Sequence, residues 1–323
     1  MDRINVVYAS DRFYFPYIYV GIETLYESNK ELERLDVYYI HQDVPQEMLR
    51  YLETLAETYN RKIHIIEFDM PEEFQNVLPA YGAASKTTYL KFWFASMFPK
   101  EDRVLYLDPD TLVMQPIKEM YSLDLGENLI AGVIENLPYY HMQASGMSED
   151  DSYINGGMVL CNLVEWRKCD FEKKALERLK DTTHNLNYDQ GILNELCRGK
   201  ILVLPPKYNV LAEVFEFADA RKIKRRYKFK NYYTQSEIDE AIKNPVIIHF
   251  TGFLYGKPLS DRCTHPYAKY FQNLLRKSPL NYEFGHADIS KGQKIRKFFL
   301  HHFPFDVYLM LENYLDIHRK REL

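Results

Sequence analysis

Apolar and polar positions along this chain follow two patterns. Apolar runs at residues 4–9, 35–41 and 63–69 are short and nearly continuous, which is typical of strands buried on both faces. Between these runs, residues 16–28 and 45–59 have the apolar spacing of helices that bury one face. Strands that alternate with helices in this way predict an α/β fold with a parallel sheet.

The same two patterns continue toward the C-terminus. They predict a strand that ends at Asp108 and five further elements, namely helices at residues 87–97, 163–180 and 189–197 and strands at residues 129–134 and 246–249. Residues 136–151 are polar and contain Gly and Met, and they predict a flexible loop of the kind that forms lids in α/β enzymes.

The most informative segment contains two carboxylates, Asp108 and Asp110, at the end of an apolar run. Side chains alternate along a strand, so the two carboxylates can face the same way. Such a pair is costly to desolvate unless a cation lies between them, and oxygen ligands suit Mg²⁺ or Mn²⁺ together with substrate phosphates. The pair therefore indicates a metal-assisted enzyme for a phosphorylated substrate. A polar strand-to-loop turn at Pro109 is the alternative explanation.

Three polar sites follow predicted strands. They are residues 9–11, the pair Asp108 and Asp110, and His249. Ligands of open α/β sheets bind beyond the carboxyl ends of the strands. We therefore expect these residues to converge on one site.

Composition narrows the function classes. A chain of 323 residues with 46% hydrophobic residues can bury a core, and a net charge of −5 argues against a dedicated nucleic-acid binder. The four cysteines form no CxxC pair, which favours a reduced cytoplasmic protein over a zinc or disulfide scaffold. We see no signal peptide and no apolar stretch of about 18 residues, so we expect no membrane span.

Several motifs occur in an order that resembles one known family. They read YASD (8–11), TTYLKF (87–92), LYLDPDTLV (105–113), NGGMVLCNLVEWR (155–167), NYDQGILN (187–194), and IHFTG followed by GKP (248–258). Together they resemble the family 8 glycosyltransferases, which include bacterial lipopolysaccharide galactosyl- and glucosyltransferases and the glycogenins. The resemblance implies a GT-A fold. Residues 1–262 would form a single Rossmann-like nucleotide-binding domain with a mostly parallel mixed sheet, and residues 263–323 a small helical C-terminal region.

The resemblance also implies roles for the residues that follow the strands. The expected metal ligands are Asp108, Asp110 and His249, which would hold Mn²⁺ or Mg²⁺. Residues expected to bind the UDP-sugar donor are Tyr8, Ala9, Ser10, Asp11, Asn155, Gly156, Gly252 and Lys257. Without the resemblance, His249 reads as a core histidine and Lys257 as a solvated loop lysine.

The expected catalytic residues are Gln190, Asp189 and Lys91, and Glu135 is expected to line the site. The resemblance places Asp189 on donor-sugar hydroxyls, Gln190 at the reacting face of the anomeric carbon, and Lys91 toward the donor. An N-terminal cap is the alternative explanation for Asp189. An exposed helix charge is the alternative for Lys91.

The chain departs from the family pattern at three points. Leu259 stands where many members have Trp, Ser10 stands where some have Asp, and the segment from Gly252 to Lys257 is longer than in the lipopolysaccharide enzymes. These departures bear on which donor sugar is preferred and on how the diphosphate is contacted.

The resemblance implies a retaining transferase that moves glucose or galactose from a UDP-sugar to a glycan or glycolipid acceptor. Lipopolysaccharide or another cell-surface polysaccharide would be the product. Three alternatives remain. Residues 107–113 also fit the signature of haloacid-dehalogenase-like phosphatases, although that motif usually lies on the first strand. The others are a non-catalytic UDP-sugar-binding protein and a self-glucosylating primer.

Two basic regions are left over. Residues 221–230 predict a loop near an anionic acceptor or membrane, or a plain solvated face. Residues 291–321 predict amphipathic aromatic helices broken at Pro304. They suit either peripheral contact with an anionic membrane, at the inner face of the plasma membrane, or packing on the main domain.

Overall fold

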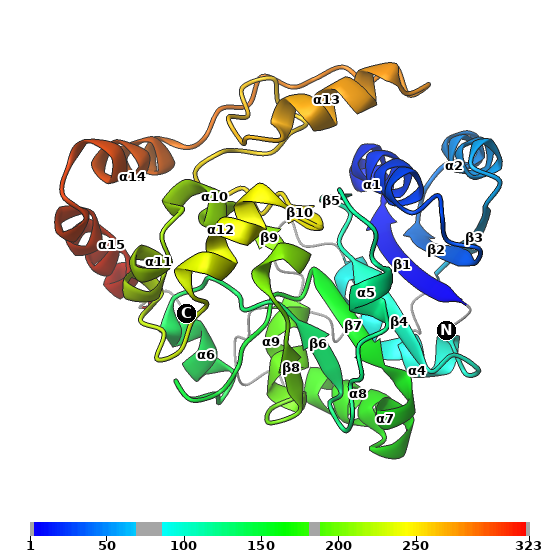
Figure 1. Ribbon diagram of the computed structural model, residues 1–323, viewed down its shortest axis with the longest axis horizontal. Coiled ribbons are helices and arrows are strands. Elements are labelled where there is room, and N and C mark those ends of the chain that lie inside the picture. The colour runs from blue at the N-terminus through cyan, green and yellow to red at the C-terminus, as the bar shows by residue number, and fades with distance from the viewer. Residues whose placement is uncertain (1–2, 69–85, 181–187, 321–323) are drawn as a thin grey trace.

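The computed structural model describes residues 3–68, 86–180 and 188–320. Its centre is a seven-stranded sheet in the order β3-β2-β1-β4-β7-β6-β8 (Figure 1). The strands are β1 (Ile4–Asp11), β2 (Leu35–Gln42), β3 (Lys62–Glu67), β4 (Arg103–Leu107), β6 (Ile130–Gly132), β7 (Met158–Asn162) and β8 (Ile201–Val203). Neighbouring strands are parallel except where β7 pairs with β4 and β6. The predicted α/β fold with a mostly parallel mixed sheet is confirmed.

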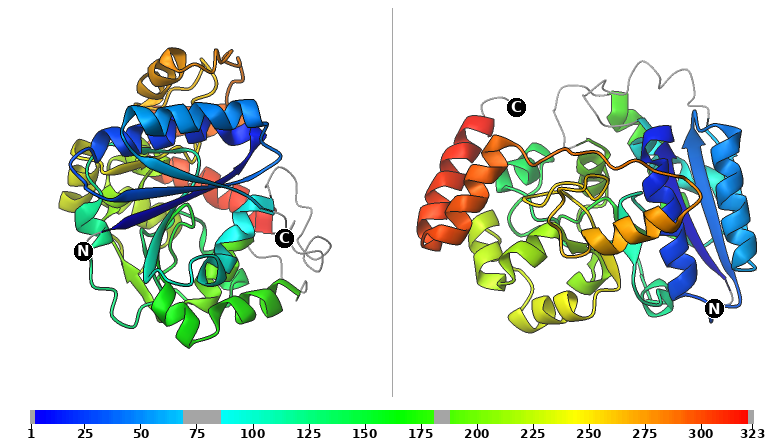
Figure 2. Two further views of the ribbon diagram at one scale, coloured as in Figure 1. Left: turned by 90° about the vertical axis from the view of Figure 1, so that its right-hand side faces the viewer. Right: turned by 90° about the horizontal axis from the view of Figure 1, so that it is seen from above.

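Alternating side chains of β1 explain why helices cover both faces of the sheet. Val6 and Tyr8 join one buried cluster, and Val7 and Ala9 join another. The first cluster contains α1 (Phe15–Ser28) and α2 (Gln46–Thr58), as Figure 2 shows on one face. The second contains η2 (Lys86–Trp93), α4 (Phe94–Met97), α7 (Leu163–Lys168), α8 (Phe171–Lys180) and α9 (Tyr188–Leu196).

A second sheet of three short strands adjoins the first. It has the order β5-β10-β9, with β5 (Thr111–Val113), β9 (Val210–Leu211) and β10 (Ile247–His249). The strand predicted at 246–249 therefore lies outside the main sheet. It pairs antiparallel with β5, which begins immediately after Asp110, and this pairing brings His249 to the end of the main sheet.

Four predicted segments differ in detail. Residues 87–97 are a 3₁₀ helix followed by one α-helical turn, and 3.0 residues per turn place Thr88 and Lys91 on the same side. The helix predicted at 163–180 breaks at Asp170, whose φ is +53°. The predicted loop 136–151 contains α6 (Tyr139–Ala144). The predicted loop at 221–230 is mostly the helix α11 (Ala220–Tyr227).

The remaining elements lie between the strands or after the last one. They are η1 (Arg12–Tyr14), α5 (Lys118–Tyr121), η3 (Pro206–Tyr208), α10 (Ala212–Phe217), α12 (Gln235–Lys243), α13 (Ala268–Lys277), α14 (Lys291–His302) and α15 (Phe305–Lys320). The last two confirm the predicted helices that break at Pro304. Residues 69, 187 and 321, which fall within predicted segments, lie outside the described residues.

A buried ion cluster attaches α15 to the body of the protein. Glu312 is fully buried and accepts hydrogen bonds from Arg226 of α11 (2.6 Å) and from Arg296 of α14 (2.5 Å). Figures 1 and 2 show α14 and α15 side by side near α11, at the opposite end of the molecule from α2. No helix among the described residues is long and apolar enough to cross a membrane.

Candidate metal and donor site

The turn between the two sheets holds the carboxylate pair. Asp108 follows β4, and its carbonyl oxygen accepts a hydrogen bond from Thr111 Oγ1 (2.8 Å), which fixes the turn. Thr111 lies opposite His249 in the β5–β10 pairing, and the Phe250 N–H donates to the Asp110 carbonyl (2.9 Å). Two strands far apart in the sequence therefore bring these three side chains together.

The three side chains offer a compact set of metal ligands. His249 Nε2 lies 3.2 Å from Asp110 Oδ1 and 3.7 Å from Asp108 Oδ2. One ligand atom from each residue lies within 4.8 Å of the others. The Asp108 side chain is 30% exposed, whereas the Asp110 and His249 side chains are buried. Two carboxylates and an imidazole, open on one side, suit Mn²⁺ or Mg²⁺ with diphosphate oxygens in the remaining positions.

Charges at this site hold one another in their ionised forms. Burial raises the pKa of Asp110, but Lys257 and His249 outweigh burial and hold that pKa well below its usual range. Burial lowers the pKa of His249, and Asp110 and Asp108 outweigh it, so the net shift is upward. A metal ion therefore competes with a proton for the His249 imidazole, and metal affinity is expected to fall as the pH falls.

Gly157 leaves room for the ligands. A Cβ at this position would lie 2.4 Å from Asp108 Oδ2 and 2.4 Å from His249 Cε1. Its carbonyl also accepts the Asp108 N–H (2.7 Å), so the backbone cannot easily withdraw. The close approach of this strand to both ligands requires a residue without a side chain.

We expect Gly157→Ala to weaken Mn²⁺ binding by about 10–100-fold, because changes in the groups that support metal ligands have effects of this size. Electron paramagnetic resonance of free Mn²⁺ measures the affinity. Gly292→Ala is the matched control, since a Cβ there meets only Ser290 Oγ at 3.9 Å. Unchanged affinity in Gly157→Ala would contradict the close packing described here.

A second cluster lies behind the metal ligands. Lys91 Nζ donates to Asp189 Oδ2 (2.6 Å) and to the Gly156 carbonyl (2.9 Å), and it lies 4.3 Å from the centroid of the Tyr106 ring. Tyr106 in turn donates to Asp108 Oδ1 (2.8 Å). Burial raises the pKa of Asp189, and Lys91 opposes this shift. A chain of contacts thus joins the predicted catalytic residues to the metal ligands.

Asn155 organises the adjacent wall. Its Nδ2 donates to Glu135 Oε2 (2.5 Å), and its Oδ1 accepts from the Gly157 N–H (3.0 Å) and from Asn209 Nδ2 (2.9 Å). Gln190 Oε1 accepts from the Gly156 N–H (2.8 Å). The oxygen of the Gln190 amide is therefore committed to the backbone, which fixes the orientation of the amide.

A cavity of about 330 Å³ opens over these residues. It is lined by eight of the predicted site residues, namely Ala9, Ser10, Asp11, Asp108, Asp110, Asn155, His249 and Lys257. Lys257 Nζ donates to Asp110 Oδ2 (2.5 Å) and to the Phe250 carbonyl (2.5 Å). The expected convergence of the three polar sites is confirmed as geometry.

Other predicted residues lie outside this lining. The Tyr8 side chain is fully buried in the core and does not reach the cavity. Gly252 has a φ of +90° and forms the turn before Lys257. Lys91, Gly156, Asp189 and Gln190 form the wall behind Asn155 and Tyr106, through the contacts given above.

Sequence reasoning missed several residues of the site. Tyr14, Thr88 and Thr251 line the cavity. Thr88 and Thr251 lie within the quoted motifs but are given no role there, and Tyr14 lies outside them. Glu213 is also buried, and burial followed by the nearby Glu135 raises its pKa to about 8. It lies in α10 among apolar residues, which read simply as a core segment.

Comparisons with known proteins agree with this geometry. The sequence profile of the family described as "Glycosyl transferase family 8" matches residues 5–261. The chain is 27% identical over 283 residues to a lipopolysaccharide 1,2-glucosyltransferase of Escherichia coli (strain K12), covering 86% of this chain and 79% of that protein. It is 26% identical over 287 residues to a lipopolysaccharide 1,3-galactosyltransferase of Salmonella typhimurium (strain LT2), with the same coverage of 86% and 79%.

The fold also has solved relatives. The galactosyltransferase LgtC, crystallised with donor and acceptor sugar analogues, superposes with a TM-score of 0.71 at 22% identity, over 90% of this chain and 99% of that one. This similarity shows the shared GT-A fold.

Proposed function

The chain belongs to glycosyl transferase family 8, and we propose that it moves glucose or galactose from a UDP-sugar to a glycan or glycolipid acceptor, with retention of anomeric configuration. The observation that carries the proposal is the set of Asp108, Asp110 and His249 in the lining of the cavity bordered by residues 9–11. The similarity to two lipopolysaccharide hexosyltransferases supports a role in lipopolysaccharide or other cell-surface polysaccharide synthesis.

The donor's diphosphate would lie between the metal ligands and Lys257. Asp108, Asp110 and the Nε2 of His249 would hold Mn²⁺ or Mg²⁺, which when bound acts as a Lewis acid and neutralises the leaving diphosphate. Lys257 is 44% exposed and can place its ammonium on a phosphate oxygen as a second positive charge. Ala9, Ser10 and Asp11 border the same cavity and would contact the uridine.

The hexose would lie against the wall organised by Asn155. Asn155 and Asp189 offer amide and carboxylate groups for sugar hydroxyls, and Lys91 holds Asp189 in place. Gln190 is fixed by the Gly156 N–H. An amide is a poor nucleophile, so we favour attack by the acceptor on the same face from which the UDP departs, with the leaving phosphate taking the acceptor's proton.

UDP release from a panel of UDP-sugars, with Mn²⁺ and with EDTA, tests the proposal. We expect slow metal-dependent hydrolysis of UDP-glucose or UDP-galactose, no glycosyl adduct in the intact mass of the enzyme, and no release of phosphate from p-nitrophenyl phosphate. Metal-dependent phosphate release would favour the phosphatase alternative. A glycosyl adduct on the protein would indicate a covalent intermediate or self-glycosylation.

We further propose that residues 1–262 form the transferase domain and that residues 263–323 attach it to the cytoplasmic face of an anionic membrane. Large apolar side chains are exposed on α14, on α15 and between them, namely Ile295, Phe298, Phe303, Met310, Tyr314 and Ile317. Lys291 and Lys294 lie beside them and are exposed. Apolar insertion with nearby basic charge is the chemistry of peripheral membrane helices.

Replacing Phe298 and Met310 with serine should reduce binding to vesicles that contain anionic lipid by at least about tenfold, because each buried side chain contributes roughly 1.5–3 kcal/mol. Vesicle co-sedimentation measures the binding. Tyr270→Ser is the control, since this exposed side chain lies on α13, outside the apolar surface of α14 and α15 that is proposed to contact the membrane. Equal binding of the double variant and the wild type would contradict membrane contact by this surface.

A further inference from the structure

Two neighbouring cavities lie beside the cavity of about 330 Å³ that holds the proposed donor site, which we call the catalytic cleft. The first, about 80 Å³, is bordered by Met142, by residues 149–153 and by Phe229 and its neighbours after α11. The second, about 200 Å³, is bordered by Gln143, Arg226 and part of α15. Both are lined by Tyr139, Tyr227 and Lys228. The two cavities therefore adjoin each other at these side chains, and we call them together the α6–α11 groove.

The groove is continuous with the wall of the catalytic cleft. Ile134 borders the first cavity, and the next residue, Glu135, accepts the hydrogen bond from Asn155 inside the cleft (2.5 Å). The Ile134 N–H binds Tyr233 Oη (3.0 Å), and Asn136 Oδ1 accepts from Tyr232 (2.9 Å). The segment 134–136 therefore lies between the cleft and the groove and contributes to the wall of both.

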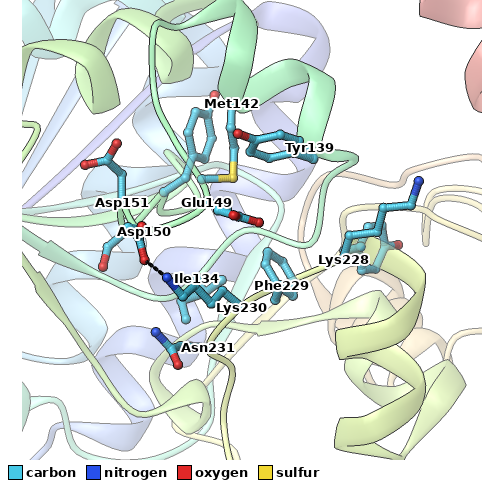
Figure 3. A pocket seen from close by; sticks show the side chains of 13 residues that line it. Ile134, Tyr139, Met142, Glu149, Asp150, Asp151, Lys228, Phe229, Lys230 and Asn231 are labelled. Atoms are coloured by element: carbon cyan, nitrogen blue, oxygen red, sulfur yellow. Dashed lines mark hydrogen bonds and ion pairs between the residues drawn. The ribbon is translucent and has the colours of Figure 1, made fainter.

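Aromatic side chains line both walls of the groove, among charged and polar ones. Figure 3 shows Tyr139 and Met142 of α6 on one side and Phe229 on the other. Phe229 is half-buried and stacks on Tyr232, with ring centroids 5.0 Å apart and an interplanar angle of 5°. Rigid amphipathic rings with a few polar groups around them are typical of sites that bind one face of a small polar molecule.

Two charged side chains of the groove, Lys230 and Asp150, are exposed and can bind a ligand in place of each other. Lys230 and Asp150 form an ion pair (2.5 Å) between the two walls, drawn as a dashed line in Figure 3. Their side chains are 53% and 66% exposed, and ion pairs at such exposure contribute about 0–1 kcal/mol. Hydroxyl groups can replace each partner at little cost. The mouth carries both signs of charge, which suits a neutral ligand.

We propose that the α6–α11 groove binds the inner sugar units of a neutral oligosaccharide acceptor, while the terminal unit enters the catalytic cleft past Glu135. This inference rests on the proposed function. The groove extends to Asn313 and Ile317 of α15, and Ile317 belongs to the exposed apolar surface described above. A glycan that leads away from a lipid anchor can therefore follow the groove toward the cleft.

A glycan array carrying neutral and anionic oligosaccharides tests the inference, with labelled protein saturated in UDP and Mn²⁺. Asn231→Trp places an indole at the exposed rim of the first cavity without removing core packing. Tyr139→Ala removes the ring shared by both cavities. We expect each variant to bind neutral tri- and tetrasaccharides at least about tenfold more weakly than the wild type. Tyr270→Ala, on α13, is the control.

Binding of UDP and Mn²⁺ should be unchanged in both variants, which shows that they fold and keep the donor site. The inference is overturned if both variants bind the same oligosaccharides as tightly as the wild type, or if the wild type binds no neutral oligosaccharide while it binds UDP and Mn²⁺. Failure of the wild type to bind UDP and Mn²⁺ would overturn the proposed function itself, and this inference with it.

Discussion

Replacing Asp110 with asparagine is expected to lower Mn²⁺ affinity and metal-dependent UDP release by more than about 100-fold, which exceeds the 10–100-fold cost of losing an outer partner of a metal ligand. Asp110 is buried and lies between two basic groups, with Oδ1 3.2 Å from His249 Nε2 and Oδ2 2.5 Å from Lys257 Nζ. A neutral amide would leave these groups without the charge that balances them. Electron paramagnetic resonance and a coupled UDP assay measure the two effects.

Asp102→Asn is the matched control for this prediction. Asp102 is exposed and stands just before β4, at the opposite end of the strand from Asp108. We expect this control to keep full metal affinity and activity. An Asp110→Asn protein that is folded, binds Mn²⁺ as the wild type does and releases UDP at the same rate would contradict the assignment of the metal site.

Lys91→Met is expected to destabilise the fold by about 3–5 kcal/mol, because it leaves one partner of a buried ion pair uncompensated. Both side chains are buried, at 2% exposure for Lys91 and 10% for Asp189. Removing Lys91 removes the interaction that opposes the rise in the pKa of Asp189. Asp189 would then hold its proton more tightly in the folded state than in the unfolded state. The loss of folding stability should therefore grow as the pH rises above the usual pKa range of Asp.

Urea denaturation at several pH values measures this effect. Two further variants make the test specific. Lys91→Met combined with Asp189→Leu should recover much of the stability, since no charge remains buried. Lys30→Met breaks a pair in which both side chains are more than half exposed and should cost no more than about 1 kcal/mol. A loss for Lys91→Met as small as that for Lys30→Met would contradict the buried pair.

Local patterns predicted the elements of this fold well because they depend on neighbours in the sequence. The alternation within β1 and the spacing within α1 and α2 follow from residues a few positions apart. The carboxylate pair could be recognised for the same reason, since Asp108 and Asp110 lie in one turn. The family motifs added His249, which an apolar strand alone would have assigned to the core.

Features that depend on distant residues could not be read in this way. The long helix predicted at 163–180 breaks at Asp170, after which α8 packs against α9, and Phe171 stacks on Trp166 with ring centroids 4.0 Å apart. Arg226 looked like part of a solvated basic run, but its partner Glu312 lies 86 residues away. Gly157 must lack a side chain only because Asp108 and His249 pack against it in the folded protein.

Calorimetric titration of the wild-type protein with UDP, in Mn²⁺ and in EDTA, measures whether donor binding depends on the metal. We expect UDP to bind at least about tenfold more tightly with Mn²⁺, because the metal ligands and Lys257 together compensate the charge of the diphosphate. Equal affinity in Mn²⁺ and in EDTA, or no binding under either condition, would contradict a donor site built on Asp108, Asp110 and His249.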